Sequence, residues 1–267
     1  MFSVLLSVYA KEKPEYLSTS LESIIEQTLV PNEIVLVKDG PLTQELEDII
    51  SIFQKKYSII KVIALTHNQG LGKALNEGLK YCSYNLVARM DTDDIAKNTR
   101  FEKQIQIFTE NPDIDICSSW IEEFEDTPVN ILAIKKLPEN HNEIIKYAKH
   151  RCPINHPSVM YKKDAVISAG GYEGFPEDYT LWIKMIMNNA KFYNIQESLL
   201  FFRFSADVIK RRGGLKYAID DIKSQTYFYQ LGFLSLNEFI YNIFIRCIVR
   251  LIPTSLRSFV YQKILRK

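Results

Sequence analysis

The stretch Leu86-Val87-Ala88-Arg89-Met90-Asp91-Thr92-Asp93-Asp94 decides how the rest of the chain can fold. Its first half has the composition of a buried strand, and that strand stops abruptly at a cluster of carboxylates. Crowded negative charges repel one another unless a cation is bound, and carboxylate oxygens suit Mn²⁺ or Mg²⁺. A solvated acidic turn that caps the next helix is the alternative. The position at the carboxyl end of a strand favours a metal site at Asp91, Asp93 and Asp94.

The residues before this stretch alternate short apolar runs with amphipathic segments. Strands are expected over 2–8, 33–37, 59–65 and 86–90, and helices over 16–27, 43–56 and 72–81. This alternation is typical of βαβ units that build a parallel sheet. Because ligands bind at the carboxyl ends of parallel strands, the turns at Tyr9, Asp39, Asn68 and Asp91 should converge on one crevice.

The pattern after Asp94 is less regular. A helix is expected over 100–109, strands near 114–120 and 158–161, and a helix over 179–188. We interpret this half as the second part of one globule, which supplies the other wall of the crevice. The expected fold class is α/β, with a mixed, mainly parallel sheet flanked by helices.

Composition excludes several classes of protein. The chain has 267 residues, with 33 basic and 32 acidic side chains and a net charge of +1, which argues against nucleic-acid binding. The 4 cysteines show no CxxC spacing, so zinc and redox sites are not indicated and reduced thiols are expected. The apolar start, residues 1–10, is too short for a signal peptide.

Two turns carry residues suited to a phosphorylated ligand. The turn over 66–76 contains Asn68, Gly70 and Lys73, whose free backbone N–H groups and ammonium group can receive phosphate oxygens. A plain helix-capping turn explains its glycines equally well. Lys210-Arg211-Arg212-Gly213-Gly214 has the composition of a basic flap that closes over phosphates, although an exposed loop is the default explanation.

Other candidates have both a structural and a functional interpretation. Asp39 can contact a ligand base or make an Asx turn, and Tyr9 can stack on a base or pack. Glu177 and Asp178 begin a helix, where carboxylates favour the positive dipole end. One of them can instead be a general base, provided that it lies at the crevice. His156 is expected to be structural.

As an ordered set these motifs resemble glycosyltransferase family 2, the inverting enzymes of GT-A fold that use nucleotide-diphosphate sugars. The resemblance covers roughly residues 1–215 and is greatest to bacterial enzymes of O-antigen, capsule and exopolysaccharide assembly. It rests on Ser7-Val-Tyr9, Val37-Lys-Asp39-Gly40, Asn68-Gln-Gly70-Leu-Gly72-Lys-Ala-Leu-Asn76, Met90-Asp-Thr-Asp-Asp94 and Pro176-Glu-Asp178.

The resemblance implies roles for individual residues. Tyr9 and Asp39 hold the nucleotide base, with UDP the expected nucleotide, and Asp91 lies near the ribose and the metal. Asp93 is the main ligand of Mn²⁺ or Mg²⁺, and Asp94 is a second candidate. Two acids of the later motif have implied roles: Asp178 is the base, and Glu177 orients the acceptor. The residues that line the donor are Asn68, Gly70, Lys73, Arg211 and Arg212.

Two departures and two alternatives accompany the resemblance. Lys38 stands where many relatives have a second acid, and Arg203-Phe-Ser205 lacks the histidine that often follows the arginine. A sugar nucleotidyltransferase is the alternative enzyme, but the loop after the first strand lacks the glycines that such an enzyme needs. A catalytically silent sugar-nucleotide-binding scaffold at a membrane is the other alternative, against which the intact acids weigh.

The net charge conceals an asymmetry. Residues 233–267 carry +5 and residues 1–232 carry −4. Apolar residues at 239, 240, 243, 244, 247, 248 and 251 share one helical face, and Asn242, Arg246 and Arg250 share another. We expect an amphipathic helix in the interface of an anionic membrane, continued by a basic segment after Pro253. A helix packed on the globule or on a second subunit is the alternative.

These observations give a domain plan and a location. Residues 1–232 are expected to form the GT-A domain, with 1–110 as the nucleotide-sugar half and 111–232 as the acceptor half and flap. Residues 233–267 are the membrane-association segment. The acceptor is expected to be a lipid-linked saccharide, which places the protein in the cytoplasm at the inner face of the cell membrane.

Overall fold

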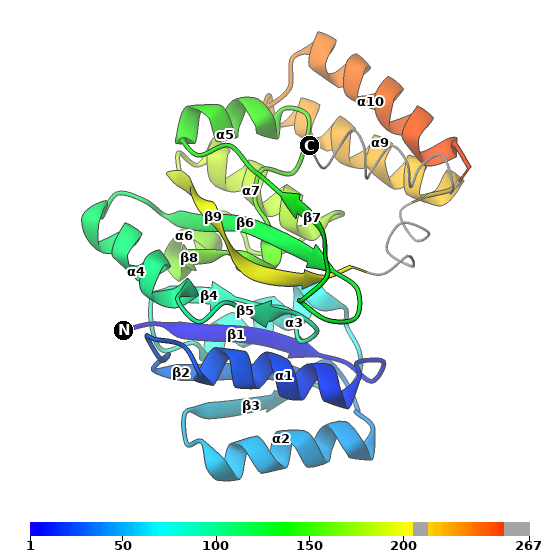
Figure 1. The fold of residues 1–267 in the computed structure, drawn as a ribbon. Helices are drawn as coiled ribbons and strands as arrows, with labels where there is room; N and C mark the ends of the chain where they lie inside the picture. The colour runs from blue at the N-terminus through cyan, green and yellow to red at the C-terminus, as the bar shows by residue number, and fades with distance from the viewer. Residues whose placement is uncertain (205–212, 254–267) are drawn as a thin grey trace.

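The computed structural model describes residues 1–204 and 213–253, and shows a mixed α/β fold built around one curved sheet (Figure 1). The strands are β1 (Ser3–Val8), β2 (Glu33–Lys38), β3 (Ile60–Ala64), β4 (Leu86–Arg89), β5 (Ile95–Ala96), β6 (Ile116–Phe124), β7 (Ile131–Lys135), β8 (Met160–Lys162) and β9 (Phe192–Arg203). The helices are α1 (Pro14–Ile25), α2 (Gln44–Lys56), α3 (Leu71–Tyr81), α4 (Arg100–Glu110), α5 (His141–Ala148), η1 (His156–Ser158), α6 (Lys163–Ser168), α7 (Glu177–Met187), α9 (Leu215–Gln230) and α10 (Leu236–Leu251).

The strand order in the sheet is β3-β2-β1-β4-β8-β6-β9-β5, and β7 pairs with β6. The first four strands of this order are parallel, whereas β8 is antiparallel to both β4 and β6. Every strand and helix expected before Asp94 is present to within a few residues, so the mainly parallel sheet flanked by helices is confirmed.

The second half contains elements that the sequence pattern does not reveal, namely β5, β7, β9, α5, α6 and α9. The longest strand among these is β9, which runs parallel to β6 and antiparallel to β5. Its centre carries Gln196, Glu197 and Ser198, which interrupt the apolar run that marks a strand. This strand is held in the sheet by partners that are distant in the chain. No local periodicity marks it in the sequence.

Helices cover both faces of the parallel strands, which explains the continuous apolar runs of β1 and β2. One face packs on α1, α2 and α4, and the other on α3 and α7. The alternation along β1 divides the two cores, because Val4 and Leu6 point to the first and Leu5 to the second.

Helix α10 is present as expected, but its basic side faces the protein and not the solvent. It begins in a capping box between Ser235 and Glu238, and it packs on α9. The side that contains Asn242, Arg246 and Arg250 is turned toward the protein, where both arginines pair with Asp221 of α9. The expected polar face of α10 is therefore present, but its charges are neutralised by Asp221 of α9.

No helix among residues 1–204 and 213–253 is long and apolar enough to cross a membrane. The four cysteines are free thiols, as expected.

The close packing of α3 on the sheet gives a test of the core. A Cβ on Gly78 would lie 2.4 Å from Leu5 Cδ1 and 2.6 Å from Val37 Cγ2, both of which are fully buried. Gly78→Ala should lower the free energy of unfolding by about 1–2 kcal/mol, because overpacking outweighs the gain in helix propensity. Chemical denaturation measures this loss. In the double variant with Gly78→Ala and Val37→Ala, the loss of stability should be smaller than the sum of the losses in the two single variants. Strict additivity would contradict this explanation.

Candidate active site

The turn after β2 and the turn before α3 are joined by Asp39. The buried carboxylate of Asp39 accepts hydrogen bonds from the backbone N–H of Gln69 at 2.7 Å and of Gly70 at 3.0 Å. Asn68 Nδ2 donates to the backbone carbonyl oxygen of Asp39 at 3.2 Å. Gly40 lies so close to this turn that a Cβ would stand 2.6 Å from Asn68 N, and its φ of +89° also requires glycine. Asp39, Asn68 and Gly70 thus meet as predicted. The Asp39 carboxylate joins two turns that are 30 residues apart in the chain, and these are not the bonds of an Asx turn, because Pro41 has no N–H to donate.

Tyr9 and Lys73 flank this turn on exposed positions. Tyr9 follows β1 with 42% of its surface exposed, and Lys73 is an exposed residue in the first turn of α3. Both side chains are therefore accessible to a ligand beside the Asp39 turn. Arg211 and Arg212, the expected flap residues, lie outside the described residues.

The three acids after β4 form one cluster, with a carboxylate oxygen of each within 4.8 Å of the others. Burial, followed by the charges of Asp91 and Glu12, raises the pKa of Asp93 to about 7. Burial and the neighbouring acids raise the pKa of Asp94 well above its usual value. Asp94 Oδ2 is buried and has no hydrogen-bond partner among the described residues. An orphaned carboxylate oxygen beside Asp93 fits a hard divalent cation.

A buried arginine, Arg89, partly balances the cluster. Its side chain is 1% exposed, and its two terminal nitrogens donate to the two oxygens of Asp91, one of them at 2.8 Å. Arg100 lies beneath it and donates to the Arg89 carbonyl oxygen at 2.7 Å. Asp91 is therefore held by an arginine side chain. Within residues 1–204 and 213–253, no ion pair to the carboxylate of Asp93 or Asp94 is found. This division makes Asp93 a better metal ligand than Asp91.

Strand β9 closes the acid cluster through Arg203. Its backbone N–H donates to Asp94 Oδ1 at 2.8 Å, and its Nε donates to the Asp93 carbonyl oxygen at 3.0 Å. The guanidinium also lies 3.7 Å from the ring centroid of Tyr16. Sequence reasoning missed this role, and the available signal was an arginine at the end of an apolar run, Leu199 to Phe202.

Glu177 and Asp178 occupy the first turn of α7, beside the start of α3. A Cβ built on Gly72 would stand 3.4 Å from Glu177 Cβ. Burial and then the charge of Asp178 raise the pKa of Glu177, which also feels the charges of Arg89 and Asp91. The acids of α7 thus lie within electrostatic range of the acids after β4. Asp178 accepts the backbone N–H of Tyr179 at 2.7 Å and contacts the thiol of Cys152 at 3.8 Å.

The glycine before α7, Gly171, marks a close approach to α3. Gly171 has φ +71°, and a Cβ on it would lie 2.5 Å from Asn76 Oδ1. Asn76 exchanges two hydrogen bonds with the backbone of Tyr172, at 2.7 and 2.8 Å. The close approach is to α3 and fixes α7 beside it.

His156 is structural, in agreement with the sequence interpretation. It is buried against Tyr172 and Trp182, and Nε2 lies 3.2 Å from the Tyr172 hydroxyl. Burial and then Arg89 lower the pKa of His156 well below its usual value, so the ring is neutral.

A mixed sheet with an acid cluster at its strand ends, beside a glycine-containing turn, defines a nucleotide-sugar transferase of the GT-A class. The sequence profile described as "Glycosyl transferase family 2" matches residues 3–168. The chain belongs to glycosyltransferase family 2, and it is a glycosyltransferase.

Relatives match along the whole chain. A UDP-Gal:alpha-D-GlcNAc-diphosphoundecaprenol beta-1,3-galactosyltransferase of Escherichia coli is 46% identical, over 100% of this chain and 97% of its own length. The amylovoran biosynthesis glycosyltransferase AmsE of Erwinia amylovora is 39% identical, over 98% of both chains.

A solved structure supports the fold. The mannosyltransferase PcManGT of Pyrobaculum calidifontis, in complex with GDP-Man and Mn²⁺, has a TM-score of 0.67. It is 14% identical, and the match covers 92% of this chain and 68% of the other. The expected GT-A fold is thereby confirmed.

The electrostatics of the cluster give a prediction for metal binding. Because the pKa of Asp93 is raised to about 7, a proton competes with Mn²⁺ at low pH. The affinity of the protein for Mn²⁺ should increase by roughly tenfold between about pH 6 and about pH 8, because Asp93 is mostly protonated at the lower pH and ionised at the higher. Titration calorimetry in buffers of different ionisation enthalpy measures both the affinity and the released proton.

Two variants control this measurement. Asp93→Asn should weaken Mn²⁺ binding and reduce its pH dependence, and the remainder comes from Asp94, whose pKa is also raised. Asp48→Asn, on helix α2, should leave both unchanged. Binding by the unmodified protein that does not vary with pH would contradict the assignment of Asp93.

Proposed function

We propose that this protein is an inverting glycosyltransferase that moves a sugar from a nucleotide-diphosphate sugar, with UDP as the nucleotide, to a hydroxyl group of a lipid-linked saccharide. The reaction belongs to the biosynthesis of bacterial surface polysaccharides. The observation that carries the proposal is the acid cluster after β4, with the unpartnered Asp94 Oδ2, within electrostatic range of Glu177, which packs beside Gly72 at the start of α3.

The donor is assigned to the half of the protein formed by residues 1–110. The exposed ring of Tyr9 and the Asp39 turn are placed to receive the base. Gly70 and Lys73 lie at the start of α3, where backbone N–H groups and a lysine favour phosphate oxygens. Arg211 and Arg212 are proposed to contact the donor from the flap.

The metal is assigned to Asp93, with Asp94 and Asp91 beside it. A divalent ion held there, Mn²⁺ or Mg²⁺, would neutralise the charge that develops on the departing diphosphate. The chain itself contributes Arg89, which fixes the carboxylate of Asp91, and Arg203, which fixes the backbone of Asp93. Neither contact requires movement during the reaction, and such preorganised charge is the main source of electrostatic catalysis.

The base is assigned to Asp178 in the half formed by residues 111–232. Its carboxylate takes the proton from the acceptor hydroxyl as the oxygen attacks the anomeric carbon, and the bond to the diphosphate breaks on the opposite face. One displacement of this kind inverts the anomeric centre. Glu177 is partly buried next to Asp178 and is placed to orient the acceptor.

The acceptor class is supported by the relatives. The Escherichia coli relative is named for a GlcNAc-diphosphoundecaprenol acceptor, and the second relative for an exopolysaccharide. Family membership and the intact acids favour this function over a nucleotidyltransferase or a silent scaffold.

Replacement of Asp178 tests the reaction. Asp178→Asn should reduce transfer by about 10²–10⁴-fold, because the amide cannot accept the proton, while UDP-sugar binding stays within a few-fold of the unmodified protein. Product formation with a lipid-linked acceptor and donor binding are measured separately, and the anomer of the product is read by NMR. Asp164→Asn, an exposed acid on α6, is the control. Normal turnover by Asp178→Asn, or retention of configuration, would overturn the mechanism.

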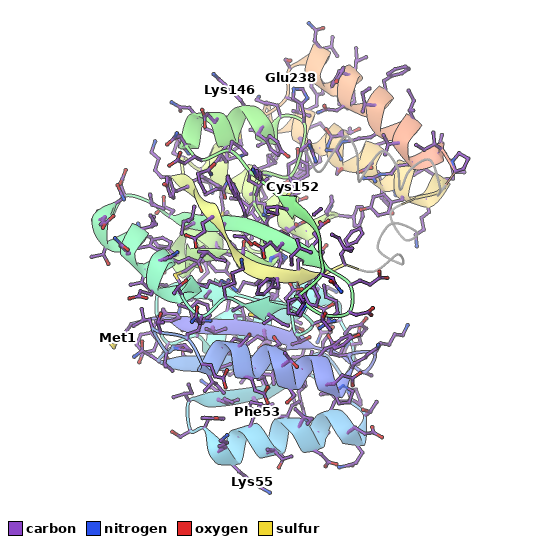
Figure 2. The ribbon with its side chains drawn as sticks, in the orientation of Figure 1. Met1, Phe53, Lys55, Lys146, Cys152 and Glu238 are labelled. Atoms are coloured by element: carbon purple, nitrogen blue, oxygen red, sulfur yellow. The ribbon has the colours of Figure 1, made fainter. Side chains whose placement is uncertain are left out.

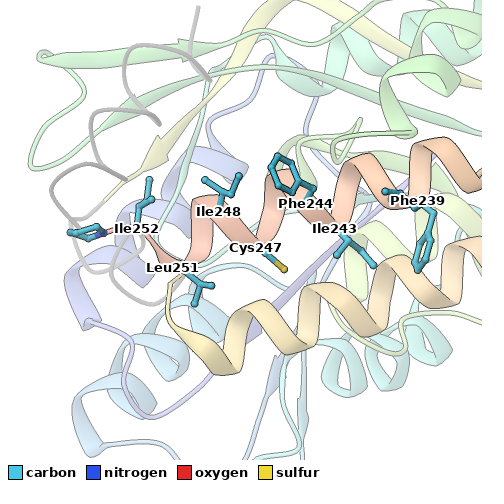
Figure 3. A pocket seen from close by; sticks show the side chains of 9 residues that line it. Phe239, Ile243, Phe244, Cys247, Ile248, Leu251 and Ile252 are labelled. Carbon is cyan, nitrogen blue, oxygen red and sulfur yellow. The ribbon is translucent and has the colours of Figure 1, made fainter.

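The outer face of α10 is proposed to meet an anionic membrane at the inner face of the cell membrane. Figure 3 shows Phe244 and Ile248 projecting on the side away from α9, and these two residues and Ile240 are exposed to 63%, 45% and 57%. A groove of about 800 Å³ along this face is lined entirely by α10 together with Ile252 and Pro253. A contiguous exposed apolar face of this kind is typical of an interaction site.

The basic residues that follow α10 in the sequence favour an anionic lipid surface as the partner of this face. Because Arg246 and Arg250 pair with Asp221, they do not face outward. The residues that follow Pro253 carry Arg257, Lys263, Arg266 and Lys267 and no acid. An apolar helix face that is followed in the sequence by basic residues fits a helix that lies in a membrane interface.

A matched pair of substitutions tests the membrane face. Ile240→Asp on α10 and Ile52→Asp on α2 alter isoleucines that are each 57% exposed. Only the α10 variant should lower binding to vesicles of phosphatidylethanolamine and phosphatidylglycerol, by roughly tenfold, because one inserted side chain is worth about 1.5–3 kcal/mol. Co-sedimentation measures the bound fraction. Equal binding by both variants would contradict the assignment.

A further inference from the structure

The inner face of α10 contains a buried ion cluster that the reaction as described does not use. Asp221 of α9 has a side chain that is 2% exposed, and it accepts a hydrogen bond from Arg246 Nη1 at 3.1 Å and from Arg250 Nε at 2.6 Å. Asn242, one turn earlier on α10, donates to Gln225 of α9 at 2.8 Å. These contacts fix α10 to α9 in one register.

The same face reaches the turn after α5. Arg246 Nη2 donates to the His150 carbonyl oxygen at 2.9 Å, and Asn242 Nδ2 donates to the Lys149 carbonyl oxygen at 2.6 Å. Two residues after His150 lies Cys152, whose thiol contacts the carboxylate of Asp178. Figure 2 labels Cys152, which is half-buried, and Glu238 at the beginning of α10.

The cluster also reaches the segment that carries Asp178. Arg250 lies 4.5 Å from the ring centroid of Tyr217, which packs edge to face on Phe175 at 5.3 Å. Arg246 lies 5.7 Å from the ring centroid of Tyr179, the residue after Asp178. The Tyr179 hydroxyl donates to the Ala148 carbonyl oxygen at 2.6 Å, which joins this segment to the turn after α5.

The two chain segments that adjoin Asp178 therefore share one support. Residues 148–152 touch its carboxylate through Cys152, residues 175–179 carry its backbone, and both are held by arginines that converge on Asp221. Loss of one member leaves buried charges without a partner, and this is costly enough to shift the others. A displacement of about 1 Å at a reacting group can cost on the order of 100-fold in rate.

We propose that Asp221, Arg246 and Arg250 form a positioning cluster that sets the location of the Asp178 carboxylate relative to the acceptor. The inference rests on the proposed function in one respect, because it takes Asp178 as the base. Helix α10 then has two roles on opposite faces: its outer face meets the membrane, and its inner face holds the segments around the base.

Neighbouring acids on α9 provide a matched test. Asp221→Asn removes the buried charge, and Asp220→Asn removes a half-buried acid that pairs with Lys223 at 3.9 Å. In the full chain, Asp221→Asn should lower kcat on the order of 10- to 100-fold, while KM and binding affinity for the UDP-sugar stay unchanged, because the donor residues lie in the other half. Asp220→Asn should match the unmodified protein.

Conservative variants keep the test valid if Asp221→Asn does not fold. Arg250→Lys keeps a positive charge toward Asp221 and should retain more kcat than Arg250→Met. Hydrogen exchange in both variants should increase in residues 148–152 and 175–179, and stay unchanged in the donor turn over 66–72. Equal kcat in Arg250→Lys and Arg250→Met, or a loss of donor affinity in proportion to kcat, would overturn the positioning role.

The result for Asp178→Asn separates this inference from the proposed function. If Asp178→Asn is inactive and Asp221→Asn has a normal kcat, only the positioning cluster is wrong. If Asp178→Asn turns over normally, the assignment of the base fails, and the positioning role falls with it.

Discussion

The structure depends on the accommodation of three carboxylates at the end of one buried strand. Arg89 neutralises Asp91 from beneath, and Arg203 binds the turn through backbone and carbonyl contacts, but Asp93 and Asp94 keep raised pKa values. Crowded carboxylates of this kind are kept either by protonation or by a cation that shares their charge. The strand order sets β4, which ends at this cluster, between β1 and β8, so the cluster stands at the strand ends of the sheet.

The same principle, compensation of a carboxylate by arginine, organises α10. Asp221 is a buried acid, and two arginines of α10 compensate it. Since this pairing uses the polar face of α10, the apolar side chains Phe244 and Ile248 are left on the outside. A buried ion cluster thus creates an exposed apolar surface, and the two proposals for this helix arise from a single packing arrangement.

Much of the fold and of the site could be predicted from sequence, because its signals are local. The β1 to β4 region has apolar runs that end in turns, and a parallel sheet gathers such turns at one edge. Asp39, Asn68, Gly70 and the acids after β4 were placed together on this ground alone. The contribution of Arg89 could not be predicted, since no local pattern marks an arginine that becomes buried. Arg203 stands at the end of an apolar run, but its contacts with Asp93 and Asp94 depend on the pairing of β9 with β5.

The sequence by itself determined the parallel half of the sheet, the acid cluster, the family and the two-faced character of residues 239–251, since each is written in residue type and spacing. Only the tertiary structure decided that β9 inserts between β6 and β5, that α7 lies beside the start of α3, and that the basic stripe of α10 turns inward. The physical reason is that periodicity gives the direction of a side chain relative to its own helix or strand. Which face meets the core depends on partners distant in the chain, here a buried acid on α9.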